Sequence, residues 1–169
     1  IVGAGESLIE IKGKESLKST QWDVLFDRIE AGTYMVAGAI TNGHVKINKI
    51  TPETIKIISS KLIEMGVVIN SGKDWVEVDA TMTELSAKNI STEPFPGFPT
   101  DMQAQFMALN TISNGSSIIE ETVFENRFQH VDELKKMGAD ISLEKNRALV
   151  KGVPNLVGAI VSASDLRAS

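Results

Sequence analysis

Two stretches of this chain are almost entirely apolar, and both close on the same Asn-Gly pair. They run from Arg28 to Thr41 and from Asp101 to Ser113, with the glycines following at Gly43 and Gly115. Apolar residues occupy every side of a helix drawn through either stretch, which is typical of a buried helix. Asn-Gly predicts a left-handed cap at the C-terminal end. The pattern therefore predicts two buried, capped helices.

A strand, a second helix and a hairpin follow the first of these helices. Residues 45–48 alternate between apolar and polar side chains, as a half-exposed strand does. Thr51-Pro52 offers an N-cap and a proline at the first helical position, which predicts a helix from there. Met65-Gly66 predicts the end of that helix, and the turn residues 71–74 predict a hairpin after it.

The same elements recur further along the chain at one constant spacing. Asn42-Gly43 matches Asn114-Gly115, and Met65-Gly66 matches Met137-Gly138, with the same offset (115 − 43 = 138 − 66 = 72). The shift also pairs Tyr34 with Phe106, Ile40 with Ile112, Ile47 with Ile119, Glu53 with Glu125, Leu62 with Leu134 and Val78 with Val150. One shift that aligns core, turn and cap positions indicates an internal repeat, rather than two segments with a similar α/β rhythm.

The ends of the chain resemble parts of the same unit. Residues 1–17 resemble the hairpin that closes an earlier unit, and residues 164–169 resemble the start of another buried helix. We therefore predict a single domain over residues 1–169. Its parts are the tail of a preceding unit (1–17), two repeat units (18–90 and 91–156) and the start of a further unit (157–169). The chain is expected to begin and stop within a unit.

Buried helices framed by half-exposed strands indicate an α/β fold with helices inside and sheets outside. A TIM barrel has the reverse order, with its strands at the centre. A doubly wound parallel sheet would show strands that are apolar almost throughout. We expect α/β units packed around central helices, with the hairpins forming outer sheets.

Composition mainly removes classes of function. The net charge of −5 over 169 residues disfavours a nucleic-acid or membrane surface, and the absence of cysteine excludes disulfides and thiolate chemistry. With only His44 and His130, a histidine-rich metal site is disfavoured, so we expect neither metal nor cofactor. There is no long apolar run and no signal-peptide pattern, which predicts a cytoplasmic location without a membrane or nucleic-acid partner.

An acid at the start of the second buried helix is the first candidate for chemistry. Asp101 follows Pro99-Thr100. Thr100 is a good N-cap, and an acid in the first turn is stabilised by the helix dipole, so capping alone explains this arrangement. The alternative is that Asp101 works as a general base, which requires the substrate proton within hydrogen-bond reach.

Two arginines at predicted helix starts are the second candidates. Arg127 lies between Phe124 and Phe128, and Arg167 follows Asp165. A cation in the first turn opposes the helix dipole. It is explained either by pairing with a neighbour (Glu125 or Asp165) or by an anion shared with the helix N-terminus. The repeat places Asp101 and Arg167 at equivalent positions, so we expect them side by side on one face.

Four longer motifs closely resemble the UDP-N-acetylglucosamine 1-carboxyvinyltransferase family. They are Phe98-Pro99-Thr100-Asp101-Met102-Gln103-Ala104-Gln105-Phe106, Glu121-Thr122-Val123-Phe124-Glu125-Asn126-Arg127-Phe128, Asp165-Leu166-Arg167-Ala168-Ser169 and Asp27-Arg28-Ile29-Glu30-Ala31-Gly32-Thr33. The resemblance extends over essentially the whole chain. It implies an inside-out α/β barrel of two similar domains, each built from three repeated units, of which this chain is most of one domain.

The resemblance also implies a reaction. The family transfers the enolpyruvyl group of phosphoenolpyruvate to the 3-hydroxyl of UDP-N-acetylglucosamine and releases phosphate, the first committed step of peptidoglycan synthesis. Carried over by motif, Asp101 would hydrogen-bond the sugar hydroxyl and receive its proton, and Val123 would contact the UDP-sugar. Arg127 would face the substrate cleft, and Arg167 would lie near the phosphoenolpyruvate anion.

Several family features fall outside this chain. These are a lysine–asparagine pair, the loop with a reactive cysteine or aspartate, a uridine-binding loop and a later arginine; Phe26 also stands where the family commonly has proline. We therefore expect the fragment alone to be inactive and its partner to be the second domain of the same enzyme. The alternatives are a domain of the shikimate-pathway enolpyruvyl transferase (EPSP synthase) and a non-catalytic binding module of the same fold.

Overall fold

The computed structural model describes residues 1–163 and shows a mixed α/β fold, which confirms the predicted class. The first part contains α1 (Arg28–Ile40), β1 (His44–Asn48), the 3₁₀ turn η1 (Pro52–Ile55), α2 (Lys56–Glu64), β2 (Val68–Ser71) and β3 (Trp75–Asp79). The second contains β4 (Ile90–Ser91), the 3₁₀ turn η2 (Thr100–Met102), α3 (Gln103–Thr111), β5 (Ser116–Glu120), α4 (His130–Lys136), β6 (Asp140–Glu144) and β7 (Arg147–Lys151). None of the helices in residues 1–163 has the length and apolar character needed to cross a bilayer.

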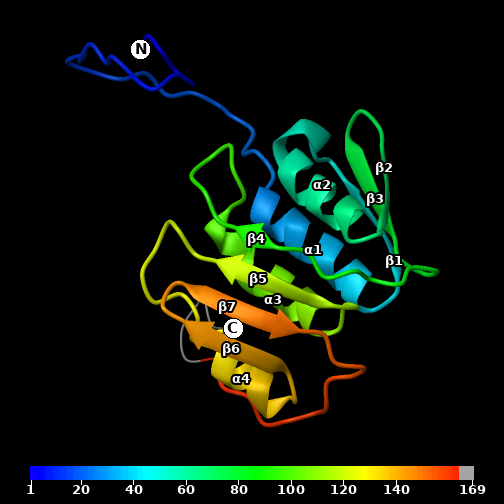
Figure 1. Cartoon of the computed structure of the whole chain (residues 1–169). Helices are drawn as coiled ribbons and strands as arrows, with labels where there is room; N and C mark the ends of the chain where they lie inside the picture. Colours follow the sequence, from blue (N-terminus) through cyan, green and yellow to red (C-terminus); the bar gives the residue numbers. More distant parts are fainter. Residues whose placement is uncertain (164–169) are drawn as a thin grey trace.

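Each half of the chain forms its own sheet (Figure 1). The first sheet has the order β1-β3-β2 and is antiparallel throughout. The second has the order β4-β5-β7-β6, in which the short β4 joins β5 in parallel and the other pairs are antiparallel. Because β4 follows the first hairpin but pairs in the second sheet, it ties the two halves together.

The elements recur at the spacing found in the sequence. β1 and β5 have bounds that differ by 72 residues at both ends, and so do β3 and β7. The helices α1 and α3 also contact each other at equivalent residues, because the side-chain amide of Gln105 donates a hydrogen bond to Thr33 Oγ1 at 3.0 Å across a separation of 72 residues. Contact between equivalent residues is expected when a pseudo-symmetry axis runs between the two helices.

The core lies between the helices and the inner faces of the sheets. Along β3 and β7, every second residue is buried and the residues between them face outward, which is the alternation of a sheet covered on one side. Met35 of α1 and Phe106 of α3 are fully buried. Phe98 meets Phe106 edge-to-face with ring centroids 5.0 Å apart, a favoured geometry for aromatic pairs.

The prediction that the two long apolar helices are buried on every side is wrong for the described residues. Each helix buries one face against its sheet and leaves the other open, so that Tyr34 in α1 is 56% exposed. In α3 the open side carries Ala104, Gln105 and Ala108, which line a cavity. Apolar composition all around the helix did not distinguish the sheet-facing side from this open side.

The helix ends follow the predicted turn chemistry. Asp27 caps α1 by accepting hydrogen bonds from the backbone N–H groups of Ile29 and Glu30 at 2.7 and 3.2 Å. Gly66 and Gly138, which follow the C-caps of α2 and α4, have φ of +102° and +92°. These values lie in the left-handed region that glycine occupies without a steric penalty.

One pair of equivalent positions shows how the repeats diverged. Ala80 and Gly152 are 72 residues apart, and their N–H groups donate to the equivalent carbonyls of Gly43 and Gly115, both at 2.9 Å. A Cβ on Gly152 would lie 1.7 Å from the carbonyl oxygen of Ser113, whereas Ala80 carries its Cβ in a fully buried position. The chain after β7 therefore runs closer to the end of α3 than its counterpart runs to the end of α1.

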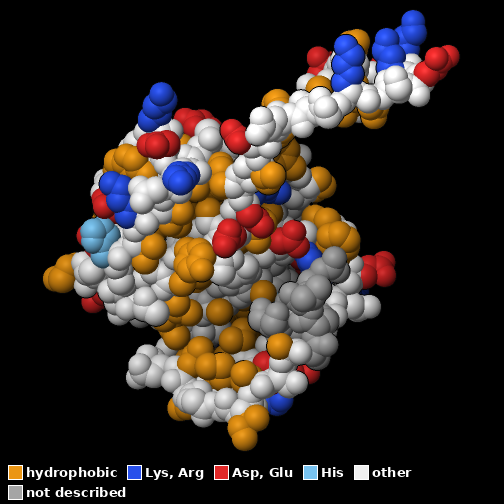
Figure 2. Space-filling model, turned by 180° about the vertical axis from the view of Figure 1, so that it is seen from behind, with side chains coloured by type: hydrophobic (Ala, Val, Ile, Leu, Met, Phe, Trp, Pro, Cys, Tyr) orange, Lys and Arg blue, Asp and Glu red, His pale blue; other side chains and the backbone are white. Residues whose placement is uncertain are grey.

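The N-terminal residues extend away from the body of the molecule (Figure 2). Val2 and Glu10 exchange two antiparallel backbone hydrogen bonds of 3.0 Å, which gives residues 1–17 a hairpin-like turn. Several apolar side chains in this arm are largely exposed, among them Leu8 (78%) and Leu17 (90%). Its assignment as the tail of an earlier unit stays a prediction.

Candidate functional site

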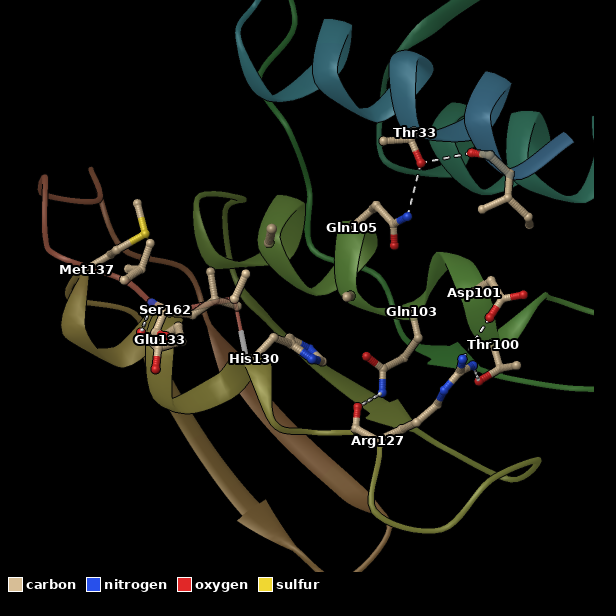
Figure 3. Close-up of a pocket in the computed structure, with 16 residues that line it drawn as sticks. Thr33, Thr100, Asp101, Gln103, Gln105, Arg127, His130, Glu133, Met137 and Ser162 are labelled. Carbon is tan, nitrogen blue, oxygen red and sulfur yellow. Dashed lines mark hydrogen bonds and ion pairs between the residues drawn. The ribbon is translucent and has the colours of Figure 1, made fainter. Parts of the chain in front are cut away.

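A cavity of about 600 Å³ opens on the exposed sides of α1 and α3. Its wall is formed by α1, by η2 and α3, by Arg127, by α4 and by residues 161–163 (Figure 3). Glu133 of α4 binds residues 161–163 to the wall, because its carboxylate accepts a hydrogen bond from the Ser162 N–H. The same carboxylate accepts a hydrogen bond from Lys136 Nζ. The same bonds, that of Lys136 first, lower the pKa of Glu133.

Asp101 and Arg127 meet at one end of this cavity. Arg127 Nη2 donates to Asp101 Oδ1 at 2.8 Å, so the pair is both a hydrogen bond and an ion pair. The Arg127 side chain is 8% exposed and that of Asp101 is 58% exposed. The guanidinium is therefore fixed within the protein, while the carboxylate it holds faces the solvent, where a substrate can reach it.

The sequence predicted Arg127 in the first turn of a helix, and this prediction is wrong. α4 begins at His130, and Asn126, just before Arg127, has φ of +57°. Of the two explanations considered for Arg127, pairing with Glu125 is not what the structure shows, because the ion-pair partner of Arg127 is Asp101. A turn with positive φ between Glu125 and Arg127 directs their side chains apart, and the helix dipole places no constraint on a residue outside the helix.

Thr100 links this pair to a buried carboxylate. The predicted role of Thr100 as an N-cap is wrong, since its hydroxyl makes no capping bond. It instead donates to Glu121 Oε2 at 2.7 Å and accepts a hydrogen bond from Arg127 Nη1. We call this path from Arg127 through the hydroxyl to Glu121 the Thr100 link.

Glu121 is 2% exposed and accepts hydrogen bonds at both carboxylate oxygens. Oε1 receives the Thr92 hydroxyl at 2.7 Å and the N–H groups of Val123 and Phe124 at 3.0 and 3.2 Å, whereas Oε2 receives Thr100. A buried charge is tolerated when donors surround it in this way. Val123 is therefore held by its backbone to the same carboxylate that supports Thr100, although it does not line the cavity.

Four buried polar atoms around the cavity have no hydrogen-bond partner. They are Gln103 Oε1, Gln105 Oε1, Arg127 Nε and His130 Nε2, and in residues 1–163 only Ser117 Oγ shares this condition. Buried polar groups are nearly always hydrogen-bonded in native proteins. These four atoms belong to residues that line the cavity, although each atom is itself buried.

His130 begins α4 and is buried against the cavity wall, 8% exposed. Burial removes water from the imidazole and lowers its pKa from 6.5 to about 4. His130 is therefore neutral at physiological pH.

The buried histidine makes stability depend on pH. Its pKa is about 4 in the folded chain and about 6.5 in the unfolded one. The unfolded chain thus binds the proton more readily, and the free energy of unfolding falls as the pH drops from 7 toward 4. The shift corresponds to a loss of about 3 kcal/mol over that range. Urea unfolding of the wild type and His130→Leu at pH 7 and 4.5 is expected to show a larger loss in the wild type.

Val131→Ala is the control for this comparison, because Val131 is also buried on α4 but does not titrate. It should lower the unfolding free energy by the same amount at both pH values. Equal pH dependence in the wild type and His130→Leu would show that His130 is not the group responsible.

The two long helices start at the same end of the cavity, as the repeat predicts. In Figure 3 the start of α3, with Thr100 and Asp101, and the start of α1 lie on the same side, and the Thr33–Gln105 bond connects the helices further along. Arg167, predicted beside Asp101, lies outside the described residues. The structure therefore brings together Asp101 and Arg127 among the predicted site residues, and connects Val123 to them through Glu121.

Sequence reasoning missed the supporting residues of the site. Glu121 belongs to one of the family motifs, and Thr92 lies outside all four of them. A signal was present in the alternation of β5, in which every second residue is buried. Glu121 directly follows this strand and occupies the next position that points into the protein. An acid at such a position requires donors, but the sequence does not say which ones. Within residues 1–163, no group of three or more His, Asp or Glu side chains is placed to hold a metal ion.

The chain is similar to known proteins over its whole length. Residues 1–169 match the family model described as EPSP synthase (3-phosphoshikimate 1-carboxyvinyltransferase). Over all 169 residues the chain is 50% identical to a UDP-N-acetylglucosamine 1-carboxyvinyltransferase of Coxiella burnetii and 48% identical to one of Pseudoalteromonas atlantica. It spans 39% and 40% of the length of these relatives.

A solved structure has the same fold. The enolpyruvyl transferase NikO from Streptomyces tendae superposes with a TM-score of 0.72 and 25% sequence identity, and the match covers 84% of this chain and 34% of that one. A family match over the entire sequence, relatives at half identity and a shared fold all point the same way. The chain belongs to the EPSP synthase family.

Proposed function

We propose that this chain is part of a UDP-N-acetylglucosamine 1-carboxyvinyltransferase. The observation that carries the proposal is the identity of 48–50%, over every residue of the chain, to two proteins with this name. The enzyme transfers the enolpyruvyl group of phosphoenolpyruvate to the 3-hydroxyl of UDP-N-acetylglucosamine and releases phosphate. The proposal includes the role in peptidoglycan synthesis and the cytoplasmic location expected from the sequence.

Within this proposal, Asp101 receives the proton of the sugar hydroxyl. Its carboxylate is 58% exposed and accepts the Arg127 bond through Oδ1, and residues 1–163 show no second bond to Oδ2. A base needs this combination of a fixed position and an open oxygen within hydrogen-bond reach of the substrate. The sugar oxygen then bonds to C2 of phosphoenolpyruvate while C3 takes up a proton and the double bond becomes single. Loss of phosphate from C2 and of a proton from C3 restores the double bond and completes the transfer.

The cations of the site have the complementary role. Anionic intermediates are stabilised by preorganised donors in a site from which water is excluded. Arg127, fixed by Thr100 and Asp101, is one such donor within the described residues. We propose Arg167 as a second one, near the phosphoenolpyruvate anion, and Val123 as a contact to the UDP-sugar.

We further propose that the complete domain is an inside-out α/β barrel and that a second domain of the same enzyme closes the site. Outer sheets packed on neighbouring helices, and the Thr33–Gln105 contact between equivalent residues, support this architecture. The share of about two fifths of each relative that the chain covers is compatible with most of one domain out of two.

The second candidate is the shikimate-pathway reaction, which the description of the matching family names. It uses the same enolpyruvyl donor with a different acceptor. The two candidates are therefore separated by the acceptor alone. The non-catalytic binding module remains a third possibility, which predicts no turnover with either acceptor.

A replacement experiment tests the proposal. This chain is inserted into the Coxiella burnetii relative in place of the segment it matches, and we call the product the host enzyme. Phosphate release is then measured with phosphoenolpyruvate and either UDP-N-acetylglucosamine or shikimate 3-phosphate. We expect release with the UDP-sugar only. Release with shikimate 3-phosphate would favour the second candidate, and no release with either would contradict both enzymatic functions.

The isolated chain is expected to release no phosphate from the same substrates. Asp101 and Arg127 supply part of the charged site, and the proposal assigns the rest to segments outside the chain. The measurement is the same phosphate assay on residues 1–169, with the host enzyme as the positive control. Turnover by the isolated chain would show that its own residues complete a site.

A further inference from the structure

We infer that Glu121 and Thr100 are positioning residues that set the orientation of the Arg127 guanidinium and, through it, of Asp101. This inference rests on the proposed function, because it assigns Asp101 to proton transfer. Glu121 is 2% exposed, so its carboxylate can act only through its hydrogen-bond partners.

The direction of each hydrogen bond in the Thr100 link is fixed by chemistry. A guanidinium can only donate, so the Thr100 oxygen must accept from Arg127 Nη1. The single hydroxyl proton of Thr100 is then available for Glu121 Oε2, which it meets at 2.7 Å. A hydroxyl used once as acceptor and once as donor has one orientation, and it holds the guanidinium at a defined angle to Asp101.

The other side of Glu121 is fixed in the same way. The Thr122 N–H can only donate, and it reaches Thr92 Oγ1 at 2.9 Å, so the Thr92 proton goes to Glu121 Oε1. The N–H groups of Val123 and Phe124 add two further donors to that oxygen. Every partner of the Glu121 carboxylate in the described residues thus donates, and only a side chain that accepts at both oxygens satisfies all of them.

This arrangement brings distant parts of the chain to one carboxylate. Thr92 follows β4, Thr100 begins η2, and Glu121 follows β5. The two threonines that donate to Glu121 therefore lie 29 and 21 residues before it. Arg127 also stacks on Phe124, with its Cζ 4.8 Å from the ring centroid. The guanidinium is therefore oriented from two directions by groups that all depend on Glu121.

Asp101, by contrast, has little else to hold it. Its side chain is 58% exposed, and within residues 1–163 Arg127 is its one side-chain hydrogen-bond partner. Removing the Thr100 link would take away the bond at Arg127 Nη1, so that the guanidinium, and Asp101 with it, would be held in a less defined orientation. A displacement of about 1 Å at a reacting group can lower a rate by about 10²-fold.

Two variants disrupt the link without removing either member of the ion pair. Thr100→Val keeps the shape and removes the hydroxyl. Glu121→Gln keeps the shape and leaves one acceptor oxygen, which the three donors at Oε1 will occupy, so that the amide nitrogen donates to the Thr100 oxygen, reverses that bond and leaves the hydroxyl proton without its acceptor. Thr100→Ser keeps the hydroxyl and is the conservative rescue.

The variants are measured in the host enzyme. Thr100→Val and Glu121→Gln are each expected to lower kcat by about 10–100-fold, with the KM for UDP-N-acetylglucosamine changing less than about threefold. Thr100→Ser should stay within about threefold of the unaltered host enzyme. The double variant should be no slower than the slower single variant, because both changes break one path.

A buried threonine outside the link is the matched control. Thr111, the last residue of α3, is fully buried and donates to the Ala108 carbonyl at 2.6 Å. Thr111→Val removes a buried hydroxyl from the helix that follows η2, and we expect it to leave kcat unchanged. A kcat for Thr100→Val within threefold of that for Thr100→Ser would overturn the inference.

Hydrogen exchange separates positioning from a merely structural role. In Glu121→Gln the amides of Val123 and Phe124 keep their acceptor, so residues 121–127 should retain their protection while kcat falls. Loss of protection together with kcat would show that Glu121 only holds the loop, and the inference would fail. The exchange measurement requires no turnover, so an inactive host enzyme would contradict the proposed function and still test the link.

Discussion

Asp101→Ala in the host enzyme is expected to lower kcat by about 10²–10⁴-fold, the usual contribution of a general base. The binding of UDP-N-acetylglucosamine should be retained, because the substitution removes one exposed carboxylate and leaves the cavity wall in place. The measurement is steady-state phosphate release together with calorimetric titration of the sugar nucleotide. Asp101→Asn should show a similar loss, since an amide keeps the bond to Arg127 but does not accept a proton.

Asp140→Ala is the matched control for this result. Asp140 is an exposed carboxylate in β6, 4.0 Å from Lys151, and does not line the cavity. It should leave both kcat and binding unchanged. If the kcat of Asp101→Ala equals that of Asp140→Ala, Asp101 is only the ion-pair partner of Arg127, and another group receives the proton of the sugar hydroxyl.

Phe106→Ala is expected to lower the free energy of unfolding of this chain by about 3–5 kcal/mol, the range for a large aromatic side chain in a core. Phe106 is fully buried in α3 and packs edge-to-face on Phe98. Its loss removes both the buried apolar area and that aromatic contact. The midpoint of urea unfolding, followed by circular dichroism, gives the value, provided that the slope of the transition is unchanged.

Phe95 provides the comparison at the surface. Phe95 is 75% exposed, and the Arg28 guanidinium lies over its ring, with Cζ 5.4 Å from the ring centroid. Phe95→Ala should lower the unfolding free energy by less than about 1 kcal/mol. Equal losses for the two variants would show that the α3 core contributes no more to stability than an exposed contact does.

The local elements could be predicted because their signals are local. The 72-residue shift located two sets of elements whose strands have the same spacing in the structure. Met65-Gly66 and Met137-Gly138 marked the ends of α2 and α4, since a left-handed glycine after the last turn is a property of a few neighbouring residues. The motifs around Asp101 and Arg127 identified the two residues that the structure pairs.

The predictions that failed depended on neighbours in space. Thr100 looked like a cap and Arg127 looked like a residue of the first helical turn, because both interpretations used only adjacent positions. In the structure the Thr100 hydroxyl is hydrogen-bonded to Glu121 and Arg127, which are 21 and 27 residues away. Likewise, the burial of α1 and α3 on every side was inferred from composition, whereas the open face is set by which elements cover them.

The sequence by itself determined the elements, their repeat and the presence of an acid and an arginine in specific motifs. Only the tertiary structure decided that Asp101 and Arg127 form a pair and that a buried Glu121 supports it through Thr100. The physical reason is that periodicity, capping and turn formation act within a few residues, whereas the donors that make a buried carboxylate tolerable come from wherever packing brings segments together. Thr92, Thr100 and the loop of Val123 and Phe124 meet at Glu121 only after the strands have paired.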